Sequence, residues 1–139
     1  MPDFSSFSSD QFMDALRRGT DGLWPLEAAI WLLARHGAWL NSPELRNLAH
    51  GGFDENDEVW AGFDARSTKE AIHSGEFGEW REDLAILLVA MSLYGDFPIT
   101  LRYTCENLSM ENLTLISEAL FKACGYKVEL VVAEGHDDY

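Results

Sequence analysis

The spacing of apolar and polar positions in the first third of the chain is that of amphipathic helices. Ser8 and Gln11 form a capping box, which predicts a helix over residues 8–18 that stops at a glycine. A second helix is predicted over residues 25–36, where a proline occupies the first helical position and a glycine follows the last residue. A third, short helix is expected over residues 42–50, ahead of two consecutive glycines.

The second half contains the most apolar element. Residues 84–91 are apolar on nearly all sides and follow two acids that suit a helix N-terminus, which predicts a central, buried helix closing at Gly95. A short helix capped by Ser67 and Glu70 is expected before it, and a longer helix over residues 109–124 after it.

In the C-terminal region the spacing of apolar residues changes from that of a helix to that of a strand. Apolar and charged residues alternate over residues 126–132, which predicts a half-buried strand. A strand needs a partner, and residues 99–103 could form one. Alternatively, Thr100 caps a short helix over residues 101–106, and the strand pairs with residues 59–63 or with a second chain. The short helix is the favoured alternative. The predicted fold is therefore mainly α with a small β element (α+β), a compact helical bundle with a C-terminal strand.

Composition restricts the partners of such a domain. The 139 residues suit a single domain, 1–139, and 47% of them are hydrophobic, which is enough for a real core. The formal charge of −14, from 24 acids and 10 bases, repels phosphate backbones and attracts basic proteins. We therefore expect no direct binding of nucleic acid. With no basic leader and no apolar run long enough for a bilayer, the sequence predicts a cytoplasmic protein that does not enter the membrane.

Residues 82–126 carry a recurrent set of features: an apolar helix, a Gly-x-x-Pro break, Thr100-Leu101-Arg102, Leu108, Asn112 and a final Ala-x-Gly. This run resembles a segment of small actinobacterial and mobile-element proteins of unassigned function. The resemblance implies a compact helical domain and transfers no catalytic residue. The run is also similar to helix-turn-helix antitoxins, although the helix that would enter the DNA groove is acidic, whereas base reading needs a basic support.

Motifs of catalysis and metal binding are missing. When the acidic stretch at residues 51–64 is aligned to a calcium loop, Val59 occupies the glycine position and Ala65 the position of the bidentate glutamate. No histidine lies at zinc-ligand spacing from another histidine or a cysteine, and no nucleophile or phosphate-loop motif occurs. The sequence therefore predicts no catalytic residue, no metal site and no cofactor.

Between residues 53 and 83, aromatic side chains are interleaved with acids, a combination found at protein-binding hot spots. The alternative is that the rings belong to the core and the acids only face water. The predicted partner-binding residues are Asp54, Glu55, Asp57, Glu58, Trp60, Phe63, Asp64, Glu76, Glu79 and Trp80.

These observations favour a non-enzymatic acidic module that binds a basic protein or a nucleic-acid-binding complex. Its sharper form is an inhibitor of a nucleic-acid-handling complex, of the anti-restriction or anti-CRISPR type or a DNA mimic. The alternatives are a helix-turn-helix regulator or antitoxin, and a small enzyme whose site is assembled in space. A homodimer is left open.

Overall fold

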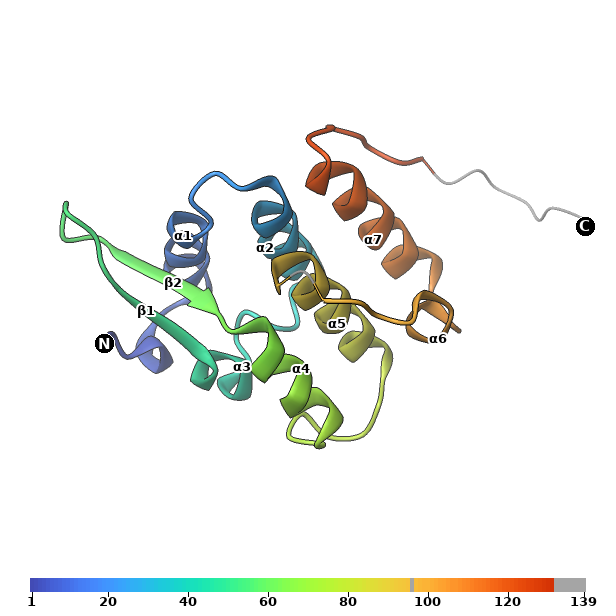
Figure 1. Ribbon diagram of the computed structural model, residues 1–139, viewed down its shortest axis with the longest axis horizontal. Coiled ribbons are helices and arrows are strands. Elements are labelled where there is room, and N and C mark those ends of the chain that lie inside the picture. The colour runs from blue at the N-terminus through green and yellow to red at the C-terminus, as the bar shows by residue number, and fades with distance from the viewer. Residues whose placement is uncertain (96, 132–139) are drawn as a thin grey trace, which may run out of the picture.

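The computed structural model describes residues 1–95 and 97–131, which form seven α-helices, one 3-10 turn and one two-stranded sheet (Figure 1). The predicted class, mainly α with a small β element, is confirmed. In chain order the elements are η1 (Phe4–Ser6), α1 (Ser9–Gly19), α2 (Trp24–His36), α3 (Pro43–Asn47), β1 (Ala49–Phe53), β2 (Val59–Phe63), α4 (Ala65–His73), α5 (Glu82–Gly95), α6 (Leu101–Cys105) and α7 (Met110–Ala123).

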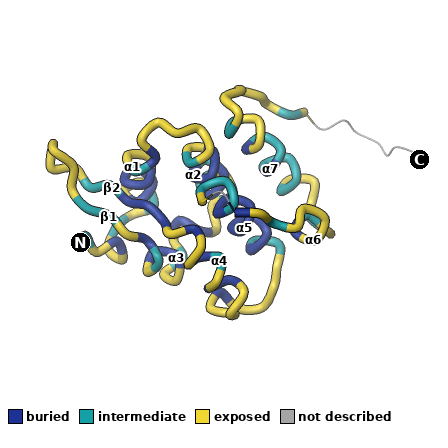
Figure 2. Tube along the Cα trace, viewed as in Figure 1, coloured by how far each residue is buried: buried dark blue, intermediate teal, exposed yellow. Residues whose placement is uncertain are grey.

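Helix α5 forms the centre of the molecule, as its apolar composition predicts. Every residue from Leu84 to Met91 is buried, because α2 packs on one side of the helix and α4 on another (Figure 2). Helix α7 covers α2 in turn, and α1 lies along strand β2. A helix surrounded by neighbours has no solvent side and so needs no polar stripe.

The predicted starts of the first two helices and the stop of the second are confirmed; α1 includes Gly19, where it was expected to stop, and has Thr20 as its C-cap. The backbone amide of Gln11 donates to Ser8 Oγ at 3.1 Å, and the amide of Ser8 donates to Gln11 Oε1 at 2.8 Å, which completes the capping box. Helix α2 has its proline in the first turn and ends at Gly37. The backbone of Gly37 is left-handed, with φ of 87°, a conformation that glycine adopts without a steric penalty.

The helix predicted over residues 42–50 is wrong in its second half. Helix α3 ends at Asn47, and Ala49–Phe53 forms an antiparallel hairpin with Val59–Phe63. The hairpin lies so close to α1 that a Cβ at Gly19 would collide with the carbonyl oxygen of Ala61. This packing against α1 is a tertiary contact, and local helix signals cannot anticipate it.

The C-terminal strand predicted over residues 126–132 is also wrong within the described residues. Residues 126–131 form no strand and most of their side chains are exposed; residue 132 lies outside the described part of the chain. The amide of Leu130 donates instead to Glu118 Oε1 at 3.1 Å. An alternating pattern becomes a strand only beside another strand, and the hairpin lies at the opposite end of the molecule from the segment that follows α7 (Figure 1).

Two further helix predictions have different outcomes. The favoured short helix after Thr100 is confirmed as α6, with Thr100 at the N-cap position. The capping box predicted for Ser67 and Glu70 is wrong, because α4 begins earlier. Its N-cap is Asp64, whose carboxylate accepts the amide of Ser67 at 3.1 Å.

None of the helices in residues 1–95 and 97–131 combines the length and the apolar character that a membrane crossing requires.

Candidate partner-binding surfaces

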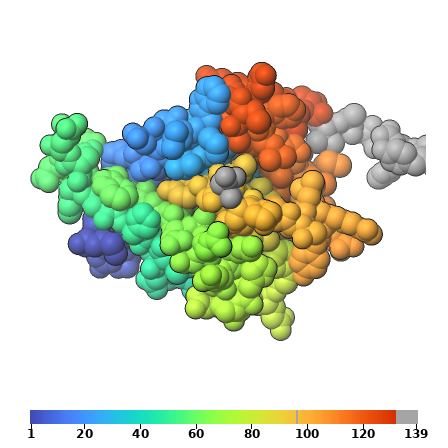
Figure 3. All heavy atoms as spheres, in the orientation of Figure 1, coloured from blue at the N-terminus to red at the C-terminus, as the bar shows by residue number. Residues whose placement is uncertain are grey.

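The acidic turn, residues 54–58, is the tip of the hairpin and projects at one end of the molecule (Figures 1 and 3). Asp54 shapes the turn, since its Oδ1 accepts the amides of Asn56 at 2.8 Å and Glu58 at 2.9 Å. Glu58 lies 3.8 Å from the Arg18 guanidinium. All four carboxylates of the turn are exposed, so they form a concentrated negative charge that solvent and a partner can reach.

The aromatic residues near this turn differ from the prediction. Phe63 is buried, with its ring 6.2 Å from Phe12 and 5.9 Å from Tyr94, so it belongs to the core and is withdrawn as a contact residue. Trp60 is half-buried and meets the His50 ring edge-on at 5.9 Å. Phe53 is instead the exposed ring beside the turn, at 59%. Strand alternation alone would not have found it, because Phe53 lies on the same face of β1 as the buried Ala49; Phe53 is exposed because it lies at the turn end of the hairpin.

Asp64 is exposed, but its carboxylate serves the fold. The hydrogen bond from the amide of Ser67 lowers the pKa of Asp64 below its ordinary value, because that bond favours the ionised form. Asp64 therefore acts first as a helix cap and only secondarily as part of an acidic surface.

Glu76, Glu79 and Trp80 form a second surface, because the segment between α4 and α5 lies well away from the acidic turn (Figure 1). The ten predicted residues thus divide into two groups. Both acids are exposed, and Trp80 is 44% exposed. The Trp80 ring lies 5.8 Å from the ring of Tyr103 on α6, which is 59% exposed and which the sequence did not single out.

A cavity of about 180 Å³ adjoins this aromatic pair; we call it the Trp80 cavity. Two carboxylates, from Glu82 at the start of α5 and Glu106 after α6, line it together with Trp80. Apolar and polar neighbours complete its wall: Ala85, Thr104, Asn107 and Leu108. An aromatic face beside two carboxylates is suited to a cation, and a Lys or Arg side chain carries one.

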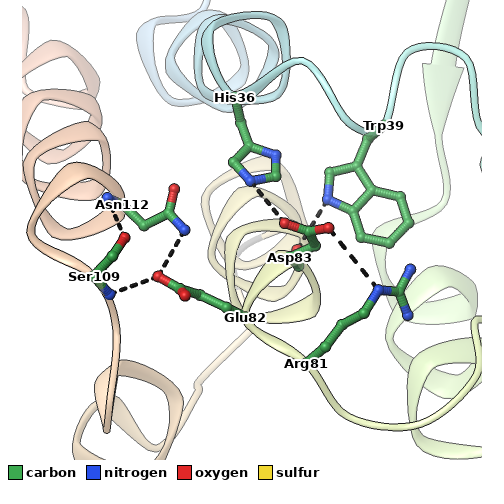
Figure 4. Close-up of polar contacts among 7 residues, drawn as sticks. All are labelled: His36, Trp39, Arg81, Glu82, Asp83, Ser109 and Asn112. Carbon is green, nitrogen blue, oxygen red and sulfur yellow. Dashed lines mark hydrogen bonds and ion pairs between the residues drawn. The ribbon is translucent and has the colours of Figure 1, made fainter.

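Glu82 is held in place by α7. Its Oε1 accepts the amide of Ser109 at 2.6 Å and the side-chain amide of Asn112 at 2.7 Å (Figure 4). These bonds, led by that of the Ser109 amide, lower the pKa of Glu82 below its ordinary value. The stability that they supply is complete above the unfolded-state pKa and is lost as the pH falls through the lower folded-state pKa. Glu82 is therefore a fixed, ionised carboxylate at neutral pH.

A neighbouring cluster joins α2 to α5. His36 Nε2 lies 3.0 Å from Asp83 Oδ1, and the indole of Trp39 donates to the carbonyl oxygen of Asp83 at 2.9 Å (Figure 4). Arg81 approaches the same carboxylate at 3.9 Å. The side chain of His36 is only 9% exposed, so a substrate cannot reach it. This acid–imidazole pair joins α2 to α5.

Cysteine and metal chemistry add little within the described residues. Both cysteines are free thiols, and partial burial raises the pKa of Cys105, which makes it a weaker nucleophile. In the described part of the chain, no group of three or more His, Cys, Asp or Glu side chains is arranged to hold a metal ion.

Comparison of the chain with protein-family models, with curated proteins and with solved structures found no match. The resemblance of residues 82–126 to small actinobacterial proteins stays a prediction.

Proposed function

We propose that this protein is a non-enzymatic acidic module that binds a basic protein. The Trp80 cavity carries the proposal, since an exposed tryptophan and two carboxylates together suit an inserted Lys or Arg side chain. A cation over an aromatic ring contributes about 0.5–1 kcal/mol at an exposed site and about 2 kcal/mol when it is desolvated. A rigid carboxylate at Glu82 adds charge without an ordering cost at the moment of binding.

In this proposal the acidic turn has a different task from the cavity. Its exposed carboxylates extend the negative field beyond the body of the domain, where they attract a basic surface before contact. Such steering changes the association rate more than the lifetime of the complex. Trp60 and Phe53 flank the turn and contribute apolar contact once the partner has arrived.

The sharper form of the proposal is inhibition of a nucleic-acid-handling complex. Such complexes present basic channels that track phosphate backbones, and a chain of charge −14 competes for the same surface. The test is affinity capture from the native host on the immobilised protein, at low and at high salt. A basic partner that elutes with rising salt supports the proposal. Capture of neutral or acidic partners alone, or of none, contradicts it.

Removing the charge of the acidic turn should slow association with the captured partner. Changing Asp54 and Asp57 to Asn, and Glu55 and Glu58 to Gln, should lower the association rate constant by roughly tenfold at low salt. The difference should shrink at high salt, where the Debye length falls below ~10 Å. Asn at position 54 keeps an oxygen acceptor for the turn, so the melting temperature should change little. Surface plasmon resonance at several salt concentrations measures the rates.

The matched control removes four exposed acids whose side chains form no hydrogen bond or ion pair among the described residues. Its substitutions are Asp10→Asn, Asp14→Asn, Glu70→Gln and Glu129→Gln. Equal slowing by both variants would mean that only the net charge acts and that the turn has no special role.

Removing the Trp80 ring should mainly shorten the lifetime of the complex. A buried aromatic hot spot is worth ~2 kcal/mol or more, so Trp80→Ala should raise the dissociation rate constant by about 30-fold. The fold should tolerate the change, because Phe77 supplies the buried contact of this segment, 5.5 Å from Trp39. Trp24→Ala removes another exposed tryptophan ring, at 57% against 44% for Trp80, and is the control. Identical dissociation by wild type and Trp80→Ala would remove the cavity from the interface.

A further inference from the structure

A second hollow lies over α2, away from the acidic turn and the Trp80 cavity. It is a cavity of about 280 Å³, close to the ~300 Å³ at which small-molecule sites begin. Met13 and Arg17 of α1 form one wall, Lys122 of α7 forms the other, and Ile30 and Trp31 of α2 form the floor. We call it the Arg17–Lys122 groove.

The groove brings together two of the few cations of the molecule. Arg17 and Lys122 come from different helices and converge on one cavity in a chain that has only 10 bases against 24 acids. Neither forms an ion pair within residues 1–95 and 97–131, even though Glu27 lines the same groove. Two cations and one acid thus line the groove itself, while Asp14 and Glu118 line the adjoining hollows that share Arg17 and Lys122.

A purely structural explanation accounts for part of this arrangement. Arg17 and Lys122 each stand in the last turn of a helix, where a cation relieves the helix dipole. That effect explains each residue singly, but it gives no reason for both to line one cavity with an aromatic floor. The backbone at Arg17 is also fixed, because its carbonyl oxygen accepts the hydroxyl of Thr20 at 2.8 Å.

The deepest residues of the groove are apolar. Met13 and Ile30 are buried, and the half-buried Trp31 presents its ring with the Lys122 ammonium 6.0 Å from the ring centroid. A planar apolar group stacks well on such a ring. An anionic group on the same ligand would meet the guanidinium, which binds carboxylates through two parallel hydrogen bonds, and the ammonium.

From these contacts we propose that the Arg17–Lys122 groove binds a small aromatic carboxylate. The carboxylate lies between Arg17 and Lys122, and the ring stacks on Trp31. This site goes beyond the proposed protein-binding function and does not depend on it, since it shares no residue with the acidic turn or the Trp80 cavity.

The experiment uses 2-naphthoate as the probe and isothermal titration calorimetry as the measurement. Wild-type protein should bind the probe, and the Arg17→Gln/Lys122→Gln variant should bind it at least about tenfold more weakly, because two charge-assisted contacts are lost. The matched control, Arg35→Gln/Lys127→Gln, removes two exposed cations outside the groove and should bind like wild type. The neutral 2-naphthalenemethanol should bind wild type about tenfold more weakly than 2-naphthoate.

Amide shifts in NMR spectra locate the probe. They should cluster on α1, α2 and α7 around the groove. Should the double variant fail to fold, Lys122→Gln alone tests the same contact and should weaken binding several-fold. The proposal is overturned if wild type does not bind 2-naphthoate, if the variants bind it unchanged, if the neutral alcohol binds equally well, or if the shifts lie elsewhere.

Discussion

Leu88→Asp is expected to unfold the protein at room temperature. Leu88 is buried in the middle of α5, where every residue from Leu84 to Met91 is buried. Losing a buried leucine costs about 2–5 kcal/mol, and an unpaired buried carboxylate costs several more. The sum reaches the ~5–15 kcal/mol that is the whole free energy of unfolding of a typical domain. Circular dichroism and a thermal melt measure the result.

The control for this substitution is Leu101→Asp, the same chemical change at an exposed position of α6. It should leave the melting temperature within a few degrees of wild type, because surface changes are usually within ±0.5 kcal/mol. Leu88→Ala should fall between the two, at about 2–5 kcal/mol. A Leu88→Asp protein with an unchanged melting temperature would mean that α5 is not the centre of the core.

Arg46→Met should lower the free energy of unfolding by about 3–5 kcal/mol, since several buried carbonyl oxygens would lose their donors at about 1–3 kcal/mol each. Arg46 is only 7% exposed. Its guanidinium donates to the carbonyl oxygens of Leu40 at 2.8 Å, of Phe4 at 3.0 Å and of Phe7. It also lies 5.0 Å from the centre of the Phe12 ring. The single side chain therefore ties the N-terminal segment, α1 and the loop before α3 together.

Urea denaturation measures the effect, and Arg35→Met at an exposed position of α2 is the control. Arg46→Lys should also be destabilising, because one ammonium cannot reproduce the fork of donors that a guanidinium presents. A change below about 1 kcal/mol for Arg46→Met would show that these carbonyl groups find other donors or water. The sequence alone did not single out this arginine, since its acceptors are backbone atoms distant along the chain.

The binding residues were predicted from charge and aromaticity. Charge indicates that a residue lies at the surface, but aromaticity does not. The acids of the turn are exposed, and so are Glu76 and Glu79, because a charged carboxylate is rarely buried in any part of a fold. Aromatic residues have no such rule: Phe63 and Phe77 are buried, whereas Phe53 and Trp80 are exposed. Phe53 and Phe63 lie on the same face of the hairpin, but only Phe63 packs on α1, so the position along the hairpin decides which ring is buried. In the α4–α5 segment, Phe77 packs on Trp39 and Trp80 does not.

By itself the sequence determined the helices, because caps, glycine stops and apolar periodicity act within a few residues. The capping box at Ser8, the stop at Gly37 and the uniformly apolar α5 are all signals of this kind. Only the tertiary structure decided the sheet, since β1 needs β2 opposite it and α1 against it, while the alternating residues 126–131 meet no strand. The tertiary structure also decided that the acidic residues form two separate surfaces and that Arg17 and Lys122 line one groove. Packing between helices that are distant in sequence sets both distances, and sequence periodicity does not report on it.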